Sequence, residues 1–275
     1  MAKSKIEWTD VTWNPVTGCT KISPGCQNCY AERMSKRLAG RCGYDKDEPF
    51  KVTLHPNRLD EPLRWKKPRR VFVCSMGDLF HEAVNFEFIN RIWATMFSAV
   101  CHKHTFMILT KRPERMLEFF EWTQKRIRQG IFGVEFERNH IWLGVTAENQ
   151  EQADKRIPIL LQIPAAVRFV SVEPMLGALD LLSNDYLGGC INCEICLDNP
   201  KSCINLAQNR KLDWIICGCE TGPGARPMHS DWVMSLRDQC QYAGVPFFLK
   251  QMEINGKIVK MPKLDGKVWD EMPCT

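Results

Sequence analysis

Three cysteines near the start of the chain are the first residues whose types and spacing could do chemistry. Cys19, Cys26 and Cys29 read Cx6CxxC. A structural zinc site usually takes four protein ligands, and a disulfide takes two cysteines. A four-iron cluster held by three thiolates leaves one iron open, and S-adenosylmethionine can bind such an iron through its amino and carboxylate groups. The spacing therefore favours a [4Fe-4S] cluster with S-adenosylmethionine over zinc, which would need a fourth ligand such as His55 or His81.

A second cysteine group stands much further along the chain. Cys190, Cys193, Cys196 and Cys203 read CxxCxxCx6C. Four thiolates at such tight spacing complete a metal site without any other ligand. We expect either a second [4Fe-4S] cluster or a structural zinc in this segment, and the spacing leaves both open.

The residues around the first cysteine group should form a strand, a loop and a helix in that order. Residues 6–9 (IEWT) read as a short first strand, and residues 30–38 read as a helix. Gly18 begins the loop between them, and a glycine lets the backbone approach a bound group closely. Cys29 should therefore stand at the amino end of a helix, where the helix dipole favours a thiolate.

Six short apolar segments recur along the rest of the chain. Each is about strand length and rich in β-branched or aromatic residues, which is typical of strands buried on both faces of a parallel sheet. They cover residues 71–75, 105–110, 141–146, 168–172, 214–217 and 246–250. Segments with helical spacing separate them at residues 86–101, 113–120, 149–161 and 230–243. This alternation predicts an α/β fold, and we expect a partial or complete βα (TIM-like) barrel rather than an open doubly wound sheet.

Polar residues follow the apolar segments at the point where each one stops. In parallel βα folds the functional site forms at the carboxyl ends of the strands. We therefore expect a ring of site residues made of Asp78, Lys111, Glu148, Glu173 and Glu220. His81 is the expected proton donor, and Lys111 with Arg112 and Arg115 could bind an anionic group. We expect Asp78, His81, Lys111, Glu148 and Glu173 to be catalytic, and Asp78, Glu148, Glu173 and Glu220 to bind the cofactor.

Two segments interrupt this rhythm and define the domain organisation. Residues 184–211 are polar and rich in cysteine, so they read as an insertion into a barrel domain that covers residues 1–253. Residues 254–275 read as a C-terminal β-hairpin extension, with a turn at Asp265-Gly266.

Blocks along nearly the whole chain carry a resemblance to a known family. They are TWNPVTGC, SPGCQNCYAERM, MGDLFHE, LTKRPERM, GVTAENQ, SVEPMLG, ETGPGARPMH, PFFLKQ and VWDEMP, within residues 12–273. The chain resembles a phage-associated three-Cys-motif family, and its three cysteines are similar to those of the radical S-adenosylmethionine superfamily, although the first gap is longer than usual. The resemblance implies radical chemistry. It also implies that Asp78, in place of a Gly-Gly-Glu run, accepts from the cofactor's amino group.

Composition narrows the cellular setting. The chain has 275 residues, 37 of them basic and 32 acidic, for a formal net charge of +5. No apolar run is long enough to cross a membrane, and the first residues lack the apolar core of a secretory signal, so we expect a cytoplasmic protein without a membrane partner. The run at residues 64–70 (RWKKPRR) could bind nucleic-acid phosphates, with Trp65 stacking on a base.

These features together predict a radical S-adenosylmethionine enzyme that modifies or repairs a nucleic acid or a nucleotide. We expect an electron-donor protein as a second partner. Two alternatives stay open. One is a zinc-bound nucleic-acid-binding protein that uses the four-cysteine group and the basic run. The other is a nuclease that binds magnesium or manganese through Asp78, Glu148 and Glu173.

Overall fold

The computed structural model describes residues 4, 6–131, 139–188 and 211–274. The chain forms two compact units. The first unit contains Met1–Val145 and Ile163–Ala166, and the second contains Thr146–Gln162 and Val167–Thr275. Both combine helices with mostly parallel strands, so the expected α/β class is confirmed.

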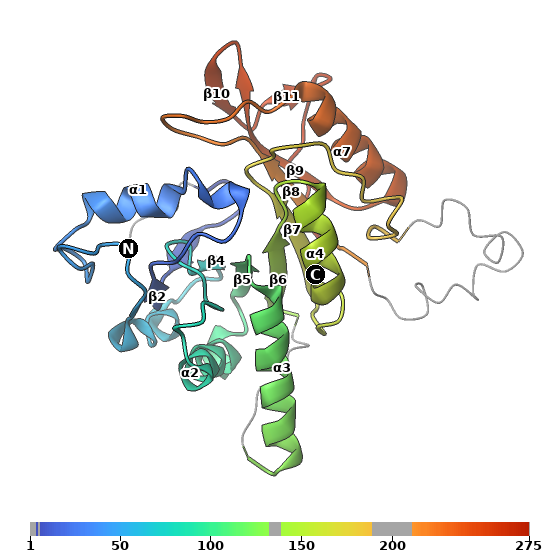
Figure 1. Ribbon diagram of the computed structural model, residues 1–275. Helices are drawn as coiled ribbons and strands as arrows, with labels where there is room; N and C mark the ends of the chain where they lie inside the picture. Colours follow the sequence, from blue (N-terminus) through green and yellow to red (C-terminus); the bar gives the residue numbers. More distant parts are fainter. Residues whose placement is uncertain (1–3, 5, 132–138, 189–210, 275) are drawn as a thin grey trace, which may run out of the picture. The chain divides into compact units, whose positions relative to one another are not determined.

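Parallel strands form the sheet of the first unit (Figure 1). They lie in chain order: β1 (Val11–Trp13), β4 (Arg70–Val73), β5 (Thr105–Thr110) and β6 (Ile141–Thr146), whose last residue belongs to the second unit. All six residues of β6 are buried, as expected for a strand covered on both faces. The apolar runs therefore located β4, β5 and β6 in the sequence.

The first strand is not where the sequence placed it. Residues 6–9 form a turn in which the Thr9 amide donates to the Ile6 carbonyl over 3.2 Å, and β1 follows at Val11–Trp13. The Thr9 hydroxyl donates to the carbonyls of Val11 and Arg70. A hydroxyl that bonds the local backbone favours a turn over a strand, which explains the shift.

Helices and short elements complete the first unit. The helices are α1 (Tyr30–Arg37), α2 (Phe86–Phe97) and α3 (Pro113–Arg128). Asn85 caps α2 by accepting from the Phe88 amide at 2.8 Å, and a proline opens α3 at a position that needs no amide hydrogen. The short elements are β2 (Val16–Thr17), which pairs with β3 (Thr53–Leu54), and the 3-10 turns η1 (Pro24–Cys26), η2 (Pro56–Arg58), η3 (Pro62–Arg64) and η4 (Ala99–Cys101).

The second unit has a similar plan. Its strands β7 (Val167–Val172), β8 (Trp214–Gly218) and β9 (Phe247–Ile254) are parallel and again lie in chain order. Its longer helices are α4 (Gln150–Leu160) and α7 (Ser230–Ala243). Apolar side chains fill both units, and every helix in the described part of the chain is too short or too polar to span a bilayer.

The C-terminal strands pair differently from the expectation. Asp265-Gly266 does form a turn, which joins β11 (Lys263–Leu264) to β12 (Lys267–Val268). However, β10 (Lys257–Lys260) pairs with the end of β9 through a turn at Asn255-Gly256. Both residues of that turn have positive φ, at 51° and 73°, and Asn-Gly is the residue pair that such hairpins prefer. One hairpin of the expected extension therefore includes the end of β9.

Candidate functional site

The cysteine loop connects β2 to α1 in the first unit. Cys26 ends the turn η1, and Cys29 is the residue that precedes the first turn of α1. The order of strand, loop and helix is the expected one. Cys19, Cys26 and Cys29 are each partly exposed. Of the other described cysteines, Cys42 and Cys274 are exposed and the rest are buried. The three thiols of the loop are therefore within reach of solvent.

Two glycines fix the start of this loop to the turn after β4. The Gly18 amide donates to the Met76 carbonyl at 2.9 Å, and Gly18 and Gly77 form an isolated parallel bridge. Gly18 has a φ of +81°, and a Cβ there would lie 2.1 Å from the Lys51 carbonyl oxygen. A Cβ on Gly77 would lie 2.8 Å from the Gly18 oxygen. Only glycine fits at these two positions, so the loop and the turn must lie in direct contact.

Asp78 stands in that turn with both carboxylate oxygens fully used. Oδ1 accepts from the Phe80 amide at 3.0 Å and from the Thr110 hydroxyl at 2.7 Å. Oδ2 accepts from the Lys111 amide at 3.1 Å and from Arg112 Nη1 at 3.3 Å. A carboxylate offers about four acceptor positions. Asp78 thus joins the ends of β4 and β5, and one of these donors would have to leave before it could accept from a cofactor.

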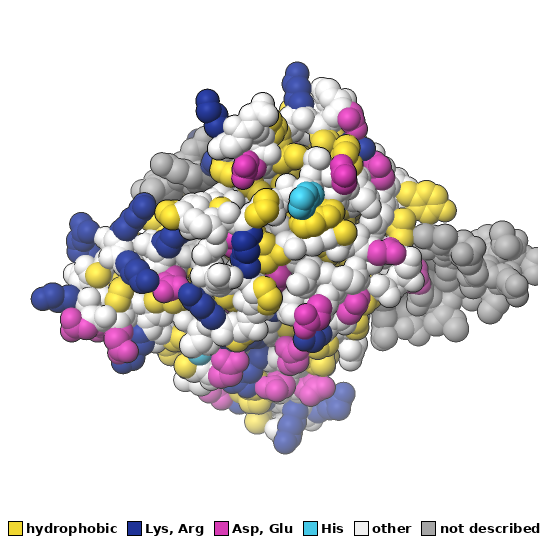
Figure 2. Space-filling view, turned by 45° about the horizontal axis from the view of Figure 1, so that its top comes forward, with side chains coloured by type: hydrophobic (Ala, Val, Ile, Leu, Met, Phe, Trp, Pro, Cys, Tyr) yellow, Lys and Arg dark blue, Asp and Glu magenta, His cyan; other side chains and the backbone are white. Residues whose placement is uncertain are grey.

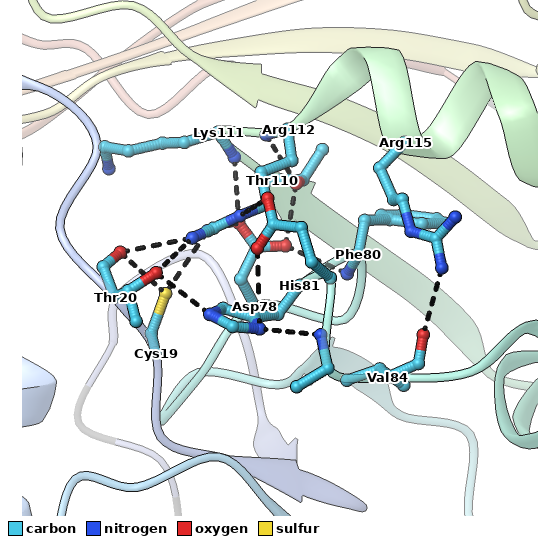
Figure 3. Close-up of polar contacts among 12 residues, drawn as sticks. Cys19, Thr20, Asp78, Phe80, His81, Val84, Thr110, Lys111, Arg112 and Arg115 are labelled. Atoms are coloured by element: carbon cyan, nitrogen blue, oxygen red, sulfur yellow. Dashed lines mark hydrogen bonds and ion pairs between the residues drawn. The ribbon is translucent and has the colours of Figure 1, made fainter.

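Arg112 links Asp78 to the cysteine loop (Figure 3). Its side chain is only 4% exposed. Nη1 lies 3.3 Å from Cys19 Sγ, Nη2 donates to the hydroxyl and the carbonyl of Thr20, and Nε donates to Glu82 at 2.9 Å. The sequence suggested that Arg112 and Arg115 bind an anionic ligand. Arg112 instead bonds protein groups.

Arg115 does not point at the loop either. Its guanidinium lies 3.8 Å from the centre of the Phe86 ring and contacts the Val84 carbonyl. Two other basic residues of this segment therefore act on the thiols: Arg112 contacts Cys19, and the charge of Lys111 acts on Cys26.

The charges around the loop act on its thiols in opposite directions. Burial and the Asp78 carboxylate raise the pKa of Cys19 to about 11, against the effect of Arg112. Burial also raises the pKa of Cys26, but the Lys111 ammonium and hydrogen bonds from Ile22 and Ser23 outweigh it, so that this pKa lies below its usual value. The surroundings therefore favour the thiolate at Cys26, whereas Cys19 stays a thiol at neutral pH until a bound group replaces its proton.

His81 is held in one tautomer. Its Nδ1 faces the Ala83 amide at 3.1 Å, and its Nε2 lies 2.9 Å from the Thr20 hydroxyl. Burial and the nearby Arg112 lower the pKa of His81, so the ring is neutral at pH 7. Because a backbone amide only donates, Nδ1 must accept and Nε2 must carry the hydrogen. The expected proton donor thus directs its one proton at Thr20.

The histidines suggested as a fourth zinc ligand are both bonded already. His55 Nε2 lies 2.8 Å from the Thr17 hydroxyl, and burial lowers the pKa of His55 to about 4. His81 has the two partners described above. Within the described residues, no group of three or more His, Cys, Asp or Glu side chains surrounds a point that one metal ion could occupy.

The three expected acids of the second unit each have a basic partner. Glu148 is fully buried and pairs with Arg156 at 2.9 Å. Glu173 pairs with Lys250 at 2.5 Å. Glu220 forms a two-pronged ion pair with Arg226. Paired carboxylates are poor ligands for magnesium or manganese, because the cation must first displace the partner, and this counts against the nuclease alternative.

The second cysteine group, Cys190, Cys193, Cys196 and Cys203, lies outside the described residues. Cys217 and Cys219, which follow this group in the sequence, are described and buried; Cys217 lies in β8 and Cys219 directly follows that strand. Burial raises the pKa of both thiols.

The basic run at residues 64–70 lies at the opposite end of β4 from the loop. Its last residue, Arg70, begins the strand, whereas Asp78 follows the strand's carboxyl end. Trp65 is 6% exposed, and its ring packs edge-on against His104 with centroids 5.6 Å apart. The indole would have to leave this contact to stack on a base, and this counts against the predicted stacking.

Comparison with known proteins adds one result to this geometry. A family described as a protein of unknown function, DUF5131, matches residues 3–273. The chain belongs to that family. Searches of curated proteins and of solved structures return no match. The description of this family names no activity.

Thr20 and Arg112 are the residues whose roles the sequence did not show. Thr20 meets His81 across 61 positions and Arg112 across 92. No local pattern can reveal such contacts. The one available signal was position, because Arg112 follows the strand end at which site residues were expected.

Proposed function

We propose that this DUF5131 protein is a radical S-adenosylmethionine enzyme with a [4Fe-4S] cluster on Cys19, Cys26 and Cys29. One observation carries the proposal. Three accessible thiols share a loop that two glycines hold against the carboxyl end of β4. Parallel βα folds place their chemistry at the carboxyl ends of their strands, which is where this loop contacts the turn after β4.

The donor set fits a cluster better than a single ion. Three thiols without a fourth protein ligand suit a four-iron cluster, which leaves one iron open for another ligand, whereas a structural zinc takes four protein ligands. Arg112 lies at Cys19, and Lys111 acts on Cys26. Cys29 stands at the amino end of α1, where the helix dipole is positive. Each thiolate would therefore have a compensating positive charge.

The bound groups and the protein would divide the work. A reduced cluster with S-adenosylmethionine supplies a carbon radical that abstracts hydrogen from a substrate or adds to it. Asp78 and Arg112 hold the loop in place through their buried ion pair. Lys111 provides a positive charge for an anionic group of the ligand. Glu148, Glu173 and Glu220 remain candidates for cofactor binding, although each first has to release its basic partner.

The fold that suits this activity is a partial βα barrel. In each unit the parallel strands follow one another in chain order, without the reversal that defines a doubly wound sheet. One-directional winding of this kind is typical of βα barrels. It supports the barrel over the open sheet.

A nucleic acid or a nucleotide is the substrate class that we favour. Between residues 19 and 51, around the cysteine loop, seven side chains are basic and four are acidic. Figure 2 shows Lys and Arg side chains projecting at the left, where Figure 1 places α1. Positive charge near a site attracts phosphate-bearing ligands. The proposal has further parts. It includes the resemblance to a phage-associated family, a cytoplasmic location and an electron-donor protein. It also includes a second cluster or a zinc at Cys190, Cys193, Cys196 and Cys203.

One experiment tests it. The protein is purified without oxygen, and iron, sulfide and zinc are assayed per chain. S-adenosylmethionine and dithionite are then added, and 5′-deoxyadenosine is measured. We expect about four irons per loop cluster and cofactor cleavage. A colourless protein that contains only zinc overturns the proposal, and iron without cleavage restricts it to a non-catalytic cluster.

A further inference from the structure

Thr20 is an exposed residue that is held from two sides. Its carbonyl accepts from the Cys19 thiol at 3.4 Å and from Arg112 Nη2 at 3.2 Å. Its hydroxyl lies 2.9 Å from Arg112 Nη2 and 2.9 Å from His81 Nε2 (Figure 3). Although Thr20 is exposed, protein groups rather than solvent alone therefore fix its carbonyl and its hydroxyl.

The direction of each hydrogen bond at the Thr20 hydroxyl can be assigned. A guanidinium only donates, so Arg112 must donate to the hydroxyl oxygen. His81 accepts from the Ala83 amide through Nδ1 and therefore carries its hydrogen on Nε2. It must also donate to the hydroxyl. Thr20 Oγ1 thus accepts two hydrogen bonds.

The hydroxyl hydrogen of Thr20 is the donor that these assignments leave without an acceptor among the described residues. A hydroxyl has two acceptor positions and one hydrogen to donate. Both acceptor positions of Thr20 are filled, and no acceptor for its hydrogen lies among the residues that the structure describes. Asp78 and Arg112, by contrast, are saturated by protein groups. The network therefore orients one hydroxyl hydrogen away from its own members, next to Cys19.

We propose that the Thr20 hydroxyl donates to an anionic oxygen of the ligand that binds over the cysteine loop. That oxygen belongs to the carboxylate of S-adenosylmethionine or to a phosphate of the substrate. Two positive side chains support the assignment, because Arg112 bonds the hydroxyl directly and Lys111 acts on Cys26 of the same loop. Thr20 is a positioning residue, and its role rests on the proposed function.

The test compares Thr20→Val with Thr20→Ser. Valine keeps the shape and removes the hydroxyl, whereas serine keeps the hydroxyl. Thr53→Val is the matched control, because Thr53 lies on the neighbouring strand β3 and donates to the Lys51 carbonyl. Dissociation constants are measured anaerobically on iron-loaded protein for S-adenosylmethionine and for its decarboxylated analogue. Inorganic phosphate is titrated on loaded and metal-free protein.

We expect Thr20→Val to weaken S-adenosylmethionine binding about tenfold, as for a hydrogen bond to a charged group, and to leave the decarboxylated analogue unchanged. Thr20→Ser and Thr53→Val should behave like the wild type. A selective loss of phosphate binding instead would assign the hydroxyl to a phosphate. Equal losses for S-adenosylmethionine and its analogue would mean that valine only disturbs the loop, and no loss for any ligand would mean that the hydroxyl serves water. Either result overturns the inference.

The proposed function can fail separately. A wild-type protein that takes up no iron overturns the cluster, and the phosphate titration of metal-free protein still decides whether Thr20 binds an anion. The thermal midpoint of each variant, measured beside the binding constants, shows whether the network remains intact.

Discussion

Arg112 and Asp78 form an ion pair of 3.3 Å in which the two side chains are 4% and 8% exposed. The same guanidinium reaches the thiol of Cys19, so one buried cation serves a strand-end carboxylate and the cysteine loop together. Removing one member of a buried pair leaves the other charged and unpaired, which is far more destabilising than losing a surface pair. The loop's position therefore depends on residue 112.

Arg112→Gln should lower the free energy of unfolding by about 3 kcal/mol, because Asp78 keeps its charge and loses its cation. Arg115→Gln is the matched control in the first turn of α3, which Arg112 directly precedes. Arg115 contacts the Phe86 ring, and its replacement should cost about 1 kcal/mol. Urea unfolding monitored by circular dichroism measures both. Equal losses for the two variants would contradict a special role for the buried pair.

The close contact at Gly18 makes a second prediction. Gly18 and Gly130 both have positive φ, at 81° and 70°, so alanine is strained at either position. A Cβ would lie 2.1 Å from the Lys51 oxygen at Gly18 but would meet no atom within 4 Å at Gly130. Gly18→Ala should therefore cost about 2 kcal/mol more than Gly130→Ala in urea unfolding. If the costs match, the loop is free to move away from residue 51.

Iron uptake gives a third prediction. Cys26→Ala removes one of the three loop thiols and should abolish the iron bound there, with loss of the broad visible absorption of the cluster. Cys274→Ala removes an exposed thiol near the C-terminus and should leave iron content unchanged. Iron and sulfide per chain are measured after anaerobic reconstitution. A Cys26 variant with full iron would exclude the loop as the site.

Much of the fold could be predicted because burial leaves a local pattern. The runs at β5 and β6 span six residues each and are mostly apolar, and the observed strands have the expected bounds. The first strand was misplaced because β1 has three residues, too few to show a period. The pairing of β10 with β9 was missed although Asn255-Gly256 carried the turn signal, because the run after it was assigned to the later turn at Asp265.

The site was less predictable than the fold. Polar residues at strand ends are expected to face a site, and this rule predicts Asp78 and Lys111. The Lys111 amide donates to Asp78, and the neighbouring Arg112 contacts Cys19 of the cysteine loop. The rule could not show that Asp78 is saturated with donors, because most of those donors come from residues 110–112, more than thirty positions away in the chain. Which strand-end residue binds a ligand and which one supports the loop depends on long-range contacts that sequence spacing does not encode.

The lowered pKa of His55 makes stability depend on pH. Burial and Arg58 lower this pKa from 6.5 to about 4, so the folded protein keeps the ring neutral while the unfolded chain takes up a proton. The contribution of His55 is present above pH 6.5 and is lost as pH falls toward about 4. His55→Gln should flatten this part of the profile, measured by urea unfolding between pH 7.5 and pH 4. An unchanged slope would assign the pH dependence to other groups.

Substitutions in the buried pair of Glu148 and Arg156 test whether Glu148 has a structural role or is available to bind a ligand. Arg156→Met alone should cost about 3 to 5 kcal/mol, because it leaves the fully buried Glu148 carboxylate without its cation. The double variant Glu148→Met, Arg156→Met should cost clearly less than the two single variants together, because it removes both charges. Urea unfolding of the four proteins completes the cycle. Additive costs would show that the two side chains act independently, and Glu148 would then be the carboxylate to test for ligand binding in the second unit.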